Sequence, residues 1–598
     1  MQGKNTNHSA IFKNFRPPPF IIQLICIFIC FSGVEFLKPA DSQAQEGTIG
    51  DTDIELFNLS GSVTNETHGY TTTRDENRRA PLGNVTTANA SFSIMGFDYS
   101  INLRYNTDDS DFRQSVNQLG FSGSWNWVRL SAGDVSPTWS NFGLRGTRIR
   151  GAHIELTPGS LILEVAAGRS RRAVDFTEEI APSRISYERL LYGARFGYGN
   201  RSGNYFLLSG FYAKDDQDSI TLPQDDNFFG SRRPSPPAEN LQVSPEFQFI
   251  LFDNLLQIGG EASISALTRD LRSDVIDAGE AGVPSFLTNI MEVRSSTRLG
   301  LAGSAFTRLD LDPVDLQLNY ERIQPGYESL GLRTVRDDQQ RYSADLGIAL
   351  FNRRLQLNNS IGLHEDNLFG DRAQTQSGID YTLDFSADVG RGISLSGGYS
   401  LNRTESGPSS PDPDIATSLF TTQNFRVQPS LNFSRNSTNH NLTLSSFYQT
   451  FESDFGNGGA GPRTDGYTLN GMAGYSITFH GGLTLNTSLN GMIGDTGGSE
   501  ILNAGINTGV GYFFFNGDLT VNVSGGVSRN EVTRPAMNGG EEFQSVSWQM
   551  NGNGRISYQV TSTGSLQLSV RANNHSIRTG EGVGFSELES RLTFNQRF

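Results

Sequence analysis

Hydrophobic and polar residues alternate with a period of two along most of the chain beyond residue 50. Between residues 483 and 493, Leu485, Leu489 and Ile493 alternate with Asn and Ser side chains, and the segments 393–402 and 519–528 repeat the pattern. A period of two places successive side chains on opposite faces of a β-strand. Each segment is about ten residues long, the length that crosses a bilayer as a tilted strand. The pattern therefore predicts β-strands that have one apolar and one polar face.

The connections between these strands alternate in length. Short turns rich in Gly, Asn and Asp, residues that tolerate the positive φ of tight hairpins, are expected at 94–97, 157–160, 252–254, 312–313, 352–353, 390–392, 436–437, 480–482, 516–517 and 562–564. Longer polar connections are expected at roughly 64–85, 134–147, 170–188, 215–240, 267–290, 324–340, 404–422, 452–463, 530–542 and 574–584. This alternation predicts an all-β fold, an antiparallel transmembrane β-barrel of about 26 strands, with about 22 as the lower bound. A soluble β-solenoid or sandwich gives no reason for connections of alternating length.

The first 44 residues have the order of a secretory signal peptide. Basic residues, including Lys13 and Arg16, precede the apolar run 20–31, and Ser42-Gln43-Ala44 fits a cleavage site. We expect a cleaved signal peptide over 1–44, a short periplasmic N-terminus over 45–53 and the barrel over 54–598; the alternative is an uncleaved N-terminal anchor. Both cysteines lie in the apolar run, so the mature chain is expected to form no disulfide. The short N-terminus leaves no room for a separate plug domain.

The last residues, ESRLTFNQRF, continue the alternation to Phe598. Leu592, Phe594 and Phe598 fall on one face, which Gln596 interrupts, and most of the charged residues fall on the other. This ending resembles the C-terminal signal of bacterial outer-membrane β-barrels, in which a terminal aromatic residue follows an alternating final strand. The resemblance implies that the barrel-assembly machinery reads Leu592, Phe594 and Phe598, that the C-terminus is periplasmic and that the long loops are extracellular. It also implies outer-membrane lipid and lipopolysaccharide as partners, and a periplasmic partner protein is compatible with it.

The densest cluster of aromatic and basic residues lies in the long connection 133–151. Its candidate functional residues are Asp134, Trp139, Arg145 and Arg148. Aromatic rings together with guanidinium groups suit a loop that folds inward as a constriction, or a site for an anionic glycan or lipid head group. The alternative is a structured surface loop whose arginines pair with nearby carboxylates, including Asp134, Glu178 and Glu179.

Parity along the strands predicts which charged side chains face the lumen. The acidic candidates are Glu155, Glu164, Asp345, Asp380, Asp384, Asp388, Glu587 and Glu589, and the basic candidates are Arg195, Arg298, Arg426, Arg571 and Arg591. Rings of mixed sign would favour small polar solutes over apolar ones. The alternative is a set of ion pairs that stiffen a filled barrel.

Other classes of function receive little support. The formal charge of −16 argues against nucleic acid as a partner. The histidines lack the spacing of a catalytic triad, and His153 is better explained as part of a polar lumen wall than as a general base, so no enzyme activity and no cofactor are expected. Acidic clusters at 108–111, 215–218, 225–226 and 412–414 are expected to be solvated loops. Calcium binding is the alternative for them, although none matches an EF-hand loop, and no metal site is predicted.

The predicted function is therefore a channel for polar solutes, gated or constricted by inward loops. The second hypothesis is a surface export or assembly barrel, an usher-like conduit or scaffold that works with a periplasmic partner. An enzyme at the barrel rim is a distant third. Host and compartment follow from the resemblance alone: the outer membrane of a Gram-negative bacterium.

Overall fold

The computed structural model describes residues 46–48, 53–55, 57–75, 78–107, 114–177, 182–222, 234–277, 289–410, 416–456, 463–536, 542–580 and 582–598. A short antiparallel hairpin, β1 (Glu46–Thr48) and β2 (Asp53–Glu55), precedes the main sheet. The described part of the chain includes the 3-10 turns η1 (Pro182–Arg184) and η4 (Phe515–Gly517). Among the described residues, no helix has the length and hydrophobicity needed to cross a membrane.

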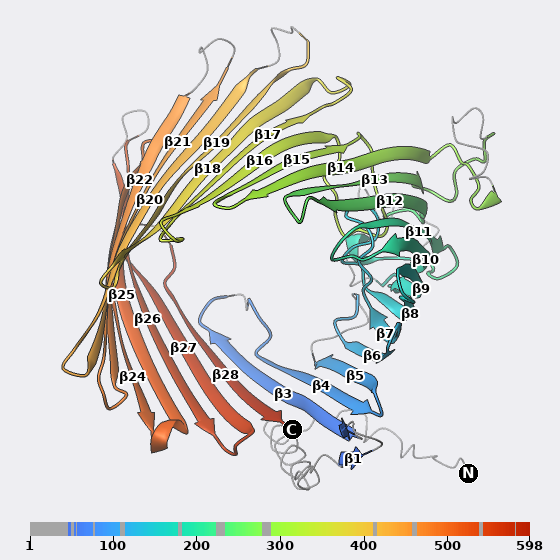
Figure 1. Cartoon of the computed structure of the whole chain (residues 1–598). Coiled ribbons are helices and arrows are strands. Elements are labelled where there is room, and N and C mark those ends of the chain that lie inside the picture. The colour runs from blue at the N-terminus through green and yellow to red at the C-terminus, as the bar shows by residue number, and fades with distance from the viewer. Residues whose placement is uncertain are drawn as a thin grey trace, which may run out of the picture.

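The main sheet is a closed antiparallel barrel of 26 strands, β3 to β28, which confirms the predicted fold class (Figure 1). The strands of the first half are β3 (Phe57–Thr72), β4 (Leu82–Ile94), β5 (Phe97–Asn106), β6 (Gln118–Trp125), β7 (Val128–Val135), β8 (Ile149–Leu156), β9 (Leu161–Arg171), β10 (Glu188–Gly199), β11 (Tyr205–Asp216), β12 (Glu239–Leu251), β13 (Leu256–Thr268), β14 (Thr297–Leu311) and β15 (Val314–Ile323). The strands of the second half are β16 (Gln339–Leu350), β17 (Leu355–Asp366), β18 (Gln374–Gly390), β19 (Ile393–Pro408), β20 (Ser418–Arg435), β21 (Thr438–Phe455), β22 (Arg463–Thr478), β23 (Thr484–Thr496), β24 (Glu500–Phe514), β25 (Leu519–Arg534), β26 (Phe543–Gln559), β27 (Gly564–Thr579) and β28 (Phe585–Arg597).

Each strand pairs with its neighbours in the sequence, except at the seam where β28 pairs with β3. Phe598 completes this seam, because its backbone exchanges two hydrogen bonds with Gly61, at 2.9 and 3.1 Å. A Cβ atom at Gly61 would lie 2.6 Å from the Phe598 ring, so glycine makes room for the aromatic side chain. Figure 1 shows β28, in red, beside β3, in blue.

Most connections have the predicted alternation, with five additions and a shift of boundaries. Tight turns at Asn126–Trp127 and at 200–204 join β6 to β7 and β10 to β11, and connections at 107–117, 367–373 and 497–499 join β5 to β6, β17 to β18 and β23 to β24; none of the five was predicted. The connection 497–499 is short although it lies at the long-loop end. At the long-loop end, several strands run further than predicted; β3, for example, continues to Thr72 and β27 to Thr579. The reason is physical: strand ends beyond the bilayer are wet on both faces, so their residues pair as strands without an apolar alternation.

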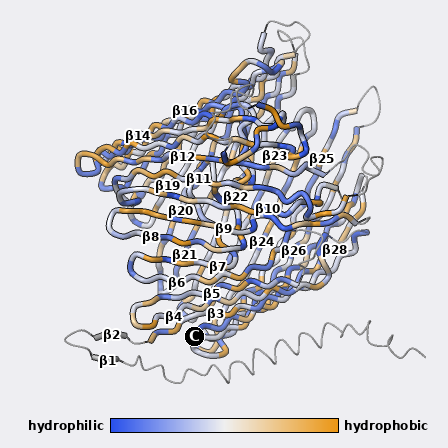
Figure 2. The backbone as a smooth tube through the Cα atoms, turned by 90° about the vertical axis from the view of Figure 1, so that its right-hand side faces the viewer, coloured by the Kyte–Doolittle hydropathy of each residue, from blue (hydrophilic) through white to orange (hydrophobic). Residues whose placement is uncertain are grey.

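The outer face of the barrel is apolar around the ring. Leu489 is 54% exposed, Ile493 46% and Phe196 54%, and each lies on the outward face of its strand. Figure 2 shows hydrophobic and hydrophilic positions alternating along the strands. Contiguous exposed apolar surface of this extent is incompatible with water and matches a lipid-facing band.

The buried core lies on the opposite, inner face and occupies one sector of the ring. Every buried hydrophobic side chain of the described residues falls between Val135 and Tyr327, and the largest cluster joins strands β7 to β11. Strands β16 to β28 contribute none. Among the described residues, segments of the chain must therefore cover the inner face of the first sector and leave that of the second sector uncovered.

Candidate functional site

Two long connections fold inward onto the wall of the barrel and cover this sector. We call residues 136–148, between β7 and β8, the first inner loop, and residues 324–338, between β15 and β16, the second inner loop. Both contact side chains on the face opposite the exposed apolar residues, and Figure 1 shows segments inside the ring beside β9 to β13. The inward-loop hypothesis thus describes the position of 136–148 better than the surface-loop alternative does.

Trp139 anchors the start of the first inner loop. Its side chain is 2% exposed, and its indole Nε1–H donates to Glu164 Oε2 at 2.6 Å. Its carbonyl accepts a hydrogen bond from the Arg195 guanidinium. Glu164 also binds His153 at 3.1 Å and Arg195 at 3.5 Å, so its carboxylate is surrounded by donors. A buried carboxylate is tolerated only with such partners.

Glu261 of β13 holds the next turn of the same loop. Its carboxylate accepts hydrogen bonds from the Ser140 hydroxyl, from the Asn141 backbone N–H at 3.1 Å and from the Asn141 side-chain amide at 3.0 Å. The Phe142 N–H adds a longer contact of 3.5 Å. One carboxylate therefore satisfies donors on three consecutive loop residues, in a place where backbone groups have no sheet partner.

The second inner loop packs against the first through Tyr327, which is fully buried. Its hydroxyl donates to the carbonyl of Phe142 at 2.7 Å and lies 2.7 Å from the Ser263 hydroxyl of β13. Burial raises the pKa of the Tyr327 phenol, so the hydroxyl stays protonated and able to donate. Ser329 repeats the link, since its hydroxyl donates to the carbonyl of Gly143 at 2.8 Å.

A short β-bridge joins the two loops along their exposed edge. Arg145 and Gly146 pair with Leu332, and the Arg145 N–H donates to the carbonyl of Gly331 at 3.1 Å. Thr147 Oγ1 donates to the same carbonyl at 2.7 Å. The two loops thus form a single lining rather than two independent segments.

The lining reaches deep into the barrel. Both loops start at the long-loop end, yet Glu164 is only the fourth residue of β9 after the tight turn 157–160, and Glu261 is the sixth residue of β13. The Trp139 and Glu261 contacts therefore lie in the half of the wall nearer the tight turns. This depth distinguishes the lining from a lid over the mouth.

The structure separates the candidate residues of 133–151 into three groups. Trp139 is an anchor, and Arg145 is exposed at the bridge. Asp134 lies at the base, where it pairs with Arg150 at 3.1 Å and Arg148 at 3.7 Å and accepts from the backbone N–H of Leu119. Asp134 and Arg148 therefore stabilise the base of the loop. The surface-loop alternative had predicted this pairing of Asp134 with arginines. Glu178 and Glu179 lie outside the described residues.

The predicted lumen charges lie in two environments. Glu164 and Arg195 are buried under the first inner loop. Glu155 pairs with Arg129 at 3.4 Å and has a half-buried side chain. Arg298, at the start of β14, donates to the backbone carbonyls of Ser295 and Thr297. Asp380 and Asp384 lie on the uncovered wall of β18, where they pair with Arg341 at 3.5 Å and Arg426 at 2.8 Å.

Sequence reasoning missed several residues of the site: Glu261, Tyr327, Ser329, Arg333 and Arg336. Glu261 lies more than a hundred residues from its partners in the first inner loop, and no local pattern marks it. The one available signal was the aromatic and turn-forming stretch Gln324-Pro325-Gly326-Tyr327, which interrupts a polar connection.

The remaining candidate chemistry is accounted for by ion pairs or lies outside the described residues. Asp215 of the cluster 215–218 is buried between Arg189 at 2.8 Å and Arg171 at 3.1 Å. Clusters 108–111, 225–226 and 412–414 lie wholly or mainly outside the described residues. Within the described part of the chain, no three His, Cys, Asp or Glu side chains are arranged to hold a metal ion.

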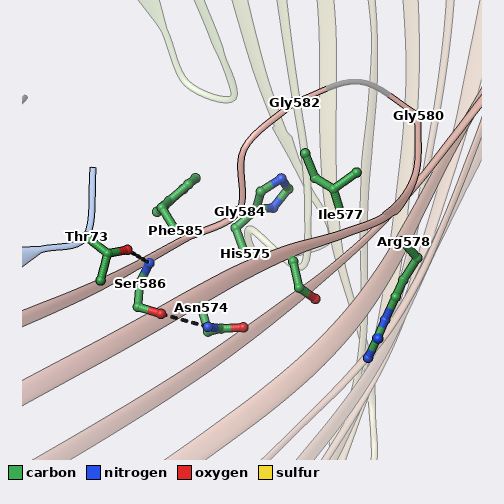
Figure 3. Close-up of a pocket in the computed structure, with 11 residues that line it drawn as sticks. Thr73, Asn574, His575, Ile577, Arg578, Gly580, Gly582, Gly584, Phe585 and Ser586 are labelled. Carbon is green, nitrogen blue, oxygen red and sulfur yellow. Dashed lines mark hydrogen bonds between the residues drawn. The ribbon is translucent and has the colours of Figure 1, made fainter. Parts of the chain in front are cut away.

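A separate hollow lies at the long-loop end of β27 and β28, close to the seam (Figure 3). Ser586 joins its two sides, because its backbone N–H binds Thr73 Oγ1 at 2.9 Å and its hydroxyl accepts from Asn574 Nδ2 at 2.8 Å. Phe585 stacks on His575 and carries the Arg74 guanidinium 3.4 Å above its ring. These contacts tie the last hairpin to β3 and explain the hollow as part of barrel closure.

Comparison with known proteins adds only distant likenesses. No protein-family model and no curated protein matches the chain. The fold is similar to OccAB4 of Acinetobacter baumannii, with 13% identity, 66% of this chain and 97% of that chain covered and a TM-score of 0.28. It is similar to a mutant ferric enterobactin receptor (PfeA) of Pseudomonas aeruginosa, with 10% identity, coverage of 90% and 80% and a TM-score of 0.35. It is similar to the E. coli P pilus tip assembly intermediate PapC-PapD-PapK-PapG, with 11% identity, coverage of 94% and 62% and a TM-score of 0.28.

Scores this low carry no argument about function. The predicted resemblance to outer-membrane β-barrels is confirmed as architecture, by the closed antiparallel ring with an even number of strands.

Proposed function

We propose that this chain is an outer-membrane channel for polar solutes whose lumen is narrowed by the two inner loops. The observation that carries the proposal is the anchoring of the first inner loop, deep in the barrel, on the buried carboxylates of Glu164 and Glu261. A loop fixed by charge-assisted hydrogen bonds at several points is a built constriction. The outer apolar band supports insertion in a membrane, and the polar inner wall supports passage of water and polar solutes.

In this proposal the tight turns are periplasmic and the long connections extracellular, so both inner loops descend from the cell surface. Solutes pass along the uncovered sector, between the lining and the wall of β18 to β28. The mixed pairs on that wall, such as Asp384 with Arg426, give the path a polar surface without a single dominant sign. The chain's role is transport and not catalysis.

A planar-bilayer recording tests the proposal, with wild type compared with a variant in which residues 137–147 are replaced by a short Gly-Ser linker. Stable ohmic current in wild type, and a larger current in the variant, are the expected results. A shift in electrophoretic mobility when the samples are heated would show that both proteins form closed barrels. Silence in both, with closed barrels, would overturn the channel proposal.

A second candidate function rests on the uncovered sector. Porins of 16–18 strands already leave an aqueous channel, and a ring of 26 strands is wider. The inner wall over β16 to β28, which no described loop covers, offers space for exported cargo or for a periplasmic partner protein. Silence in wild type together with large currents in the loop variant would favour this gated conduit over a passive channel.

The C-terminal residue gives a prediction about assembly. We expect Phe598→Ala to reduce the yield of folded barrel, because it removes the ring over Gly61 at the seam and the aromatic end of the proposed assembly signal. Arg597→Ala is the control, since Arg597 is exposed. Folded yield is measured from the heat-dependent shift in mobility of membrane extracts, and normal yield of Phe598→Ala would contradict the signal.

A further inference from the structure

We propose that the exposed edge of the inner-loop lining binds solutes that carry a carboxylate or phosphate group, through the guanidinium groups of Arg145, Arg333 and Arg336. This inference rests on the proposed channel and names the class of solute that its constriction selects. It concerns only the bridge between the loops and the short segment that follows, and it involves two arginines that sequence reasoning did not single out.

The bridge brings the backbone segments that carry Arg145 and Arg333 side by side. Arg145 pairs with Leu332, the residue before Arg333, and Arg333 Nε donates to the carbonyl of Gly146, the residue after Arg145. Arg336 follows three residues later and reaches across to β18. All three side chains are exposed, in contrast to the buried anchors beneath them.

Each of these guanidinium groups has a neutral partner. Arg145 Nη1 donates to the Asn141 side-chain oxygen at 2.7 Å, and Arg333 Nε donates to a backbone carbonyl at 3.1 Å. Arg336 Nη2 donates to the Gln376 side-chain oxygen at 3.3 Å. Within the described residues, no ion pair joins any of the three to a carboxylate, and each guanidinium has five N–H donors, of which the contact named above uses one.

The carboxylates of the second inner loop are engaged elsewhere. Asp338 is buried and pairs with Arg372 at 2.9 Å, and Glu328 pairs with Arg269 at 2.5 Å. Asp337 accepts the backbone N–H of Gly326 at 2.6 Å. Among the described residues, this edge thus carries three arginines and one carboxylate without a cationic partner, that of Asp337. Its local charge is therefore positive, although the formal charge of the whole chain is −16.

The chemistry of guanidinium selects the ligand class. Its planar fork matches the geometry of carboxylate and phosphate and is weakly hydrated, so it exchanges water for an oxyanion at low cost. Several exposed guanidinium groups on the same pair of loops suit an anion of more than one charge. By contrast, Arg148 and Arg150 both pair with the carboxylate of Asp134.

Block of the channel current by inorganic phosphate tests the site. We expect phosphate to reduce the wild-type conductance in a saturable way. In the double variant Arg145→Ala/Arg333→Ala, the half-blocking concentration should rise about fivefold or more, the factor expected from losing one close unit charge in water. Arg145→Lys/Arg333→Lys should lie between the two, because it keeps charge and loses the fork. A dicarboxylate replaces phosphate in a parallel series, to distinguish the two oxyanion classes.

Arg435→Ala, at the tight turn between β20 and β21, is the matched control that removes one exposed positive charge away from the lining. An open channel whose block is the same in wild type and in the double alanine variant would overturn the site and leave the channel intact. A silent wild type would overturn the channel instead. The site is then decided by calorimetric titration of phosphate into the detergent-solubilised barrel: binding that the double variant loses supports it, and equal or no binding rejects it.

Discussion

The two sectors of the inner wall use charged side chains in different ways. Under the inner loops, Glu164 and Glu261 are almost fully buried, and every contact they make holds another segment in place. Across the lumen, Asp384 and Arg426 form a similar ion pair, with side chains 42% and 58% exposed. An exposed ion pair is screened by water and adds little stability. A buried carboxylate that loses its donors destabilises the fold, and so do buried donors that lose their carboxylate. The difference shows that the charged residues of one sector hold the inner loops in place, whereas those of the other sector form a solvent-exposed wall.

The sectors also differ in strand length and filling. Strands β6 to β8, which lie on either side of the first inner loop in the sequence, have 8 residues each, whereas β20 and β21 on the other side of the barrel have 18. The short strands begin a wall whose inner face is packed by loops, and the long strands rely on ladder hydrogen bonds and small polar side chains. We expect perturbations of the covered sector to release the lining and those of the bare sector to be absorbed locally.

The largest expected effect is that of Glu261→Ala. Removing this carboxylate leaves the donors of Ser140 and Asn141 without a partner in a buried place, at a cost on the order of 3 kcal/mol to loop docking. The readout is proteolysis and amide hydrogen exchange within residues 136–148. Asp384→Ala is the matched change in the bare sector and should cost under about 1 kcal/mol. Equal effects of the two variants would refute the proposed contrast.

A smaller effect is expected from adding one methyl group to a glycine. A Cβ atom at Gly193 would lie 2.5 Å from the Trp139 ring, so Gly193→Ala should weaken docking of the first inner loop by about 1–3 kcal/mol. At Gly474 in β22 the nearest atom is 3.9 Å away, and Gly474→Ala should be close to neutral. Fluorescence of Trp139, measured in a background in which the other three tryptophans are replaced by Phe, moves to longer wavelength as the indole meets water and reports the first change. An unshifted spectrum in Gly193→Ala would count against the packing argument.

The smallest effect at neutral pH is that of Tyr327→Phe, which removes the hydroxyl between Phe142 and Ser263 at a cost of about 1 kcal/mol. It also carries a pH dependence. Because burial raises the pKa of Tyr327, the neutral phenol stabilises the docked loops fully below the ordinary tyrosine pKa of about 10, and this stabilisation is lost as the pH rises above it. Hydrogen exchange in the loops should therefore show an extra acceleration above about pH 10 in wild type that Tyr327→Phe lacks. The same acceleration in both proteins would assign it to another group.

The barrel could be predicted from sequence because its determinants are local. The spacing of Leu485, Leu489 and Ile493 alone predicts an outward apolar face. Most tight turns contain the Gly, Asn or Asp that a positive φ favours. The turn at Asn126–Trp127 was missed because Trp127 occupies a position where a small turn residue was expected. The ends of strands were misplaced because alternation fades where both faces meet water.

The site could be predicted only in part, because its contacts are distant in the sequence. Trp139 and Arg145 stood out in a dense loop, and parity assigned Glu164 and Arg195 to the inner wall. Nothing near Glu261 indicates that Asn141 will bind it, and nothing near Arg333 indicates that Gly146 will lie beside it. Such pairings depend on how far a loop descends into the lumen, which is a property of the closed ring.

The seam between β28 and β3 has a consequence for how the chain becomes a barrel. All other pairings join strands that follow one another, so they can form as the chain is laid down, but Asn595 must find Thr64 across 531 residues. Bringing such ends together costs about 3 kcal/mol more in chain entropy than a contact between consecutive strands, such as Asn65 with Asn84, which are 19 residues apart. Until then β3 waits as an open sheet edge, ready to pair with any other strand it meets. Closure of the barrel thus requires the two edge strands to find each other, and a factor that holds both strands close together would determine the rate of this step.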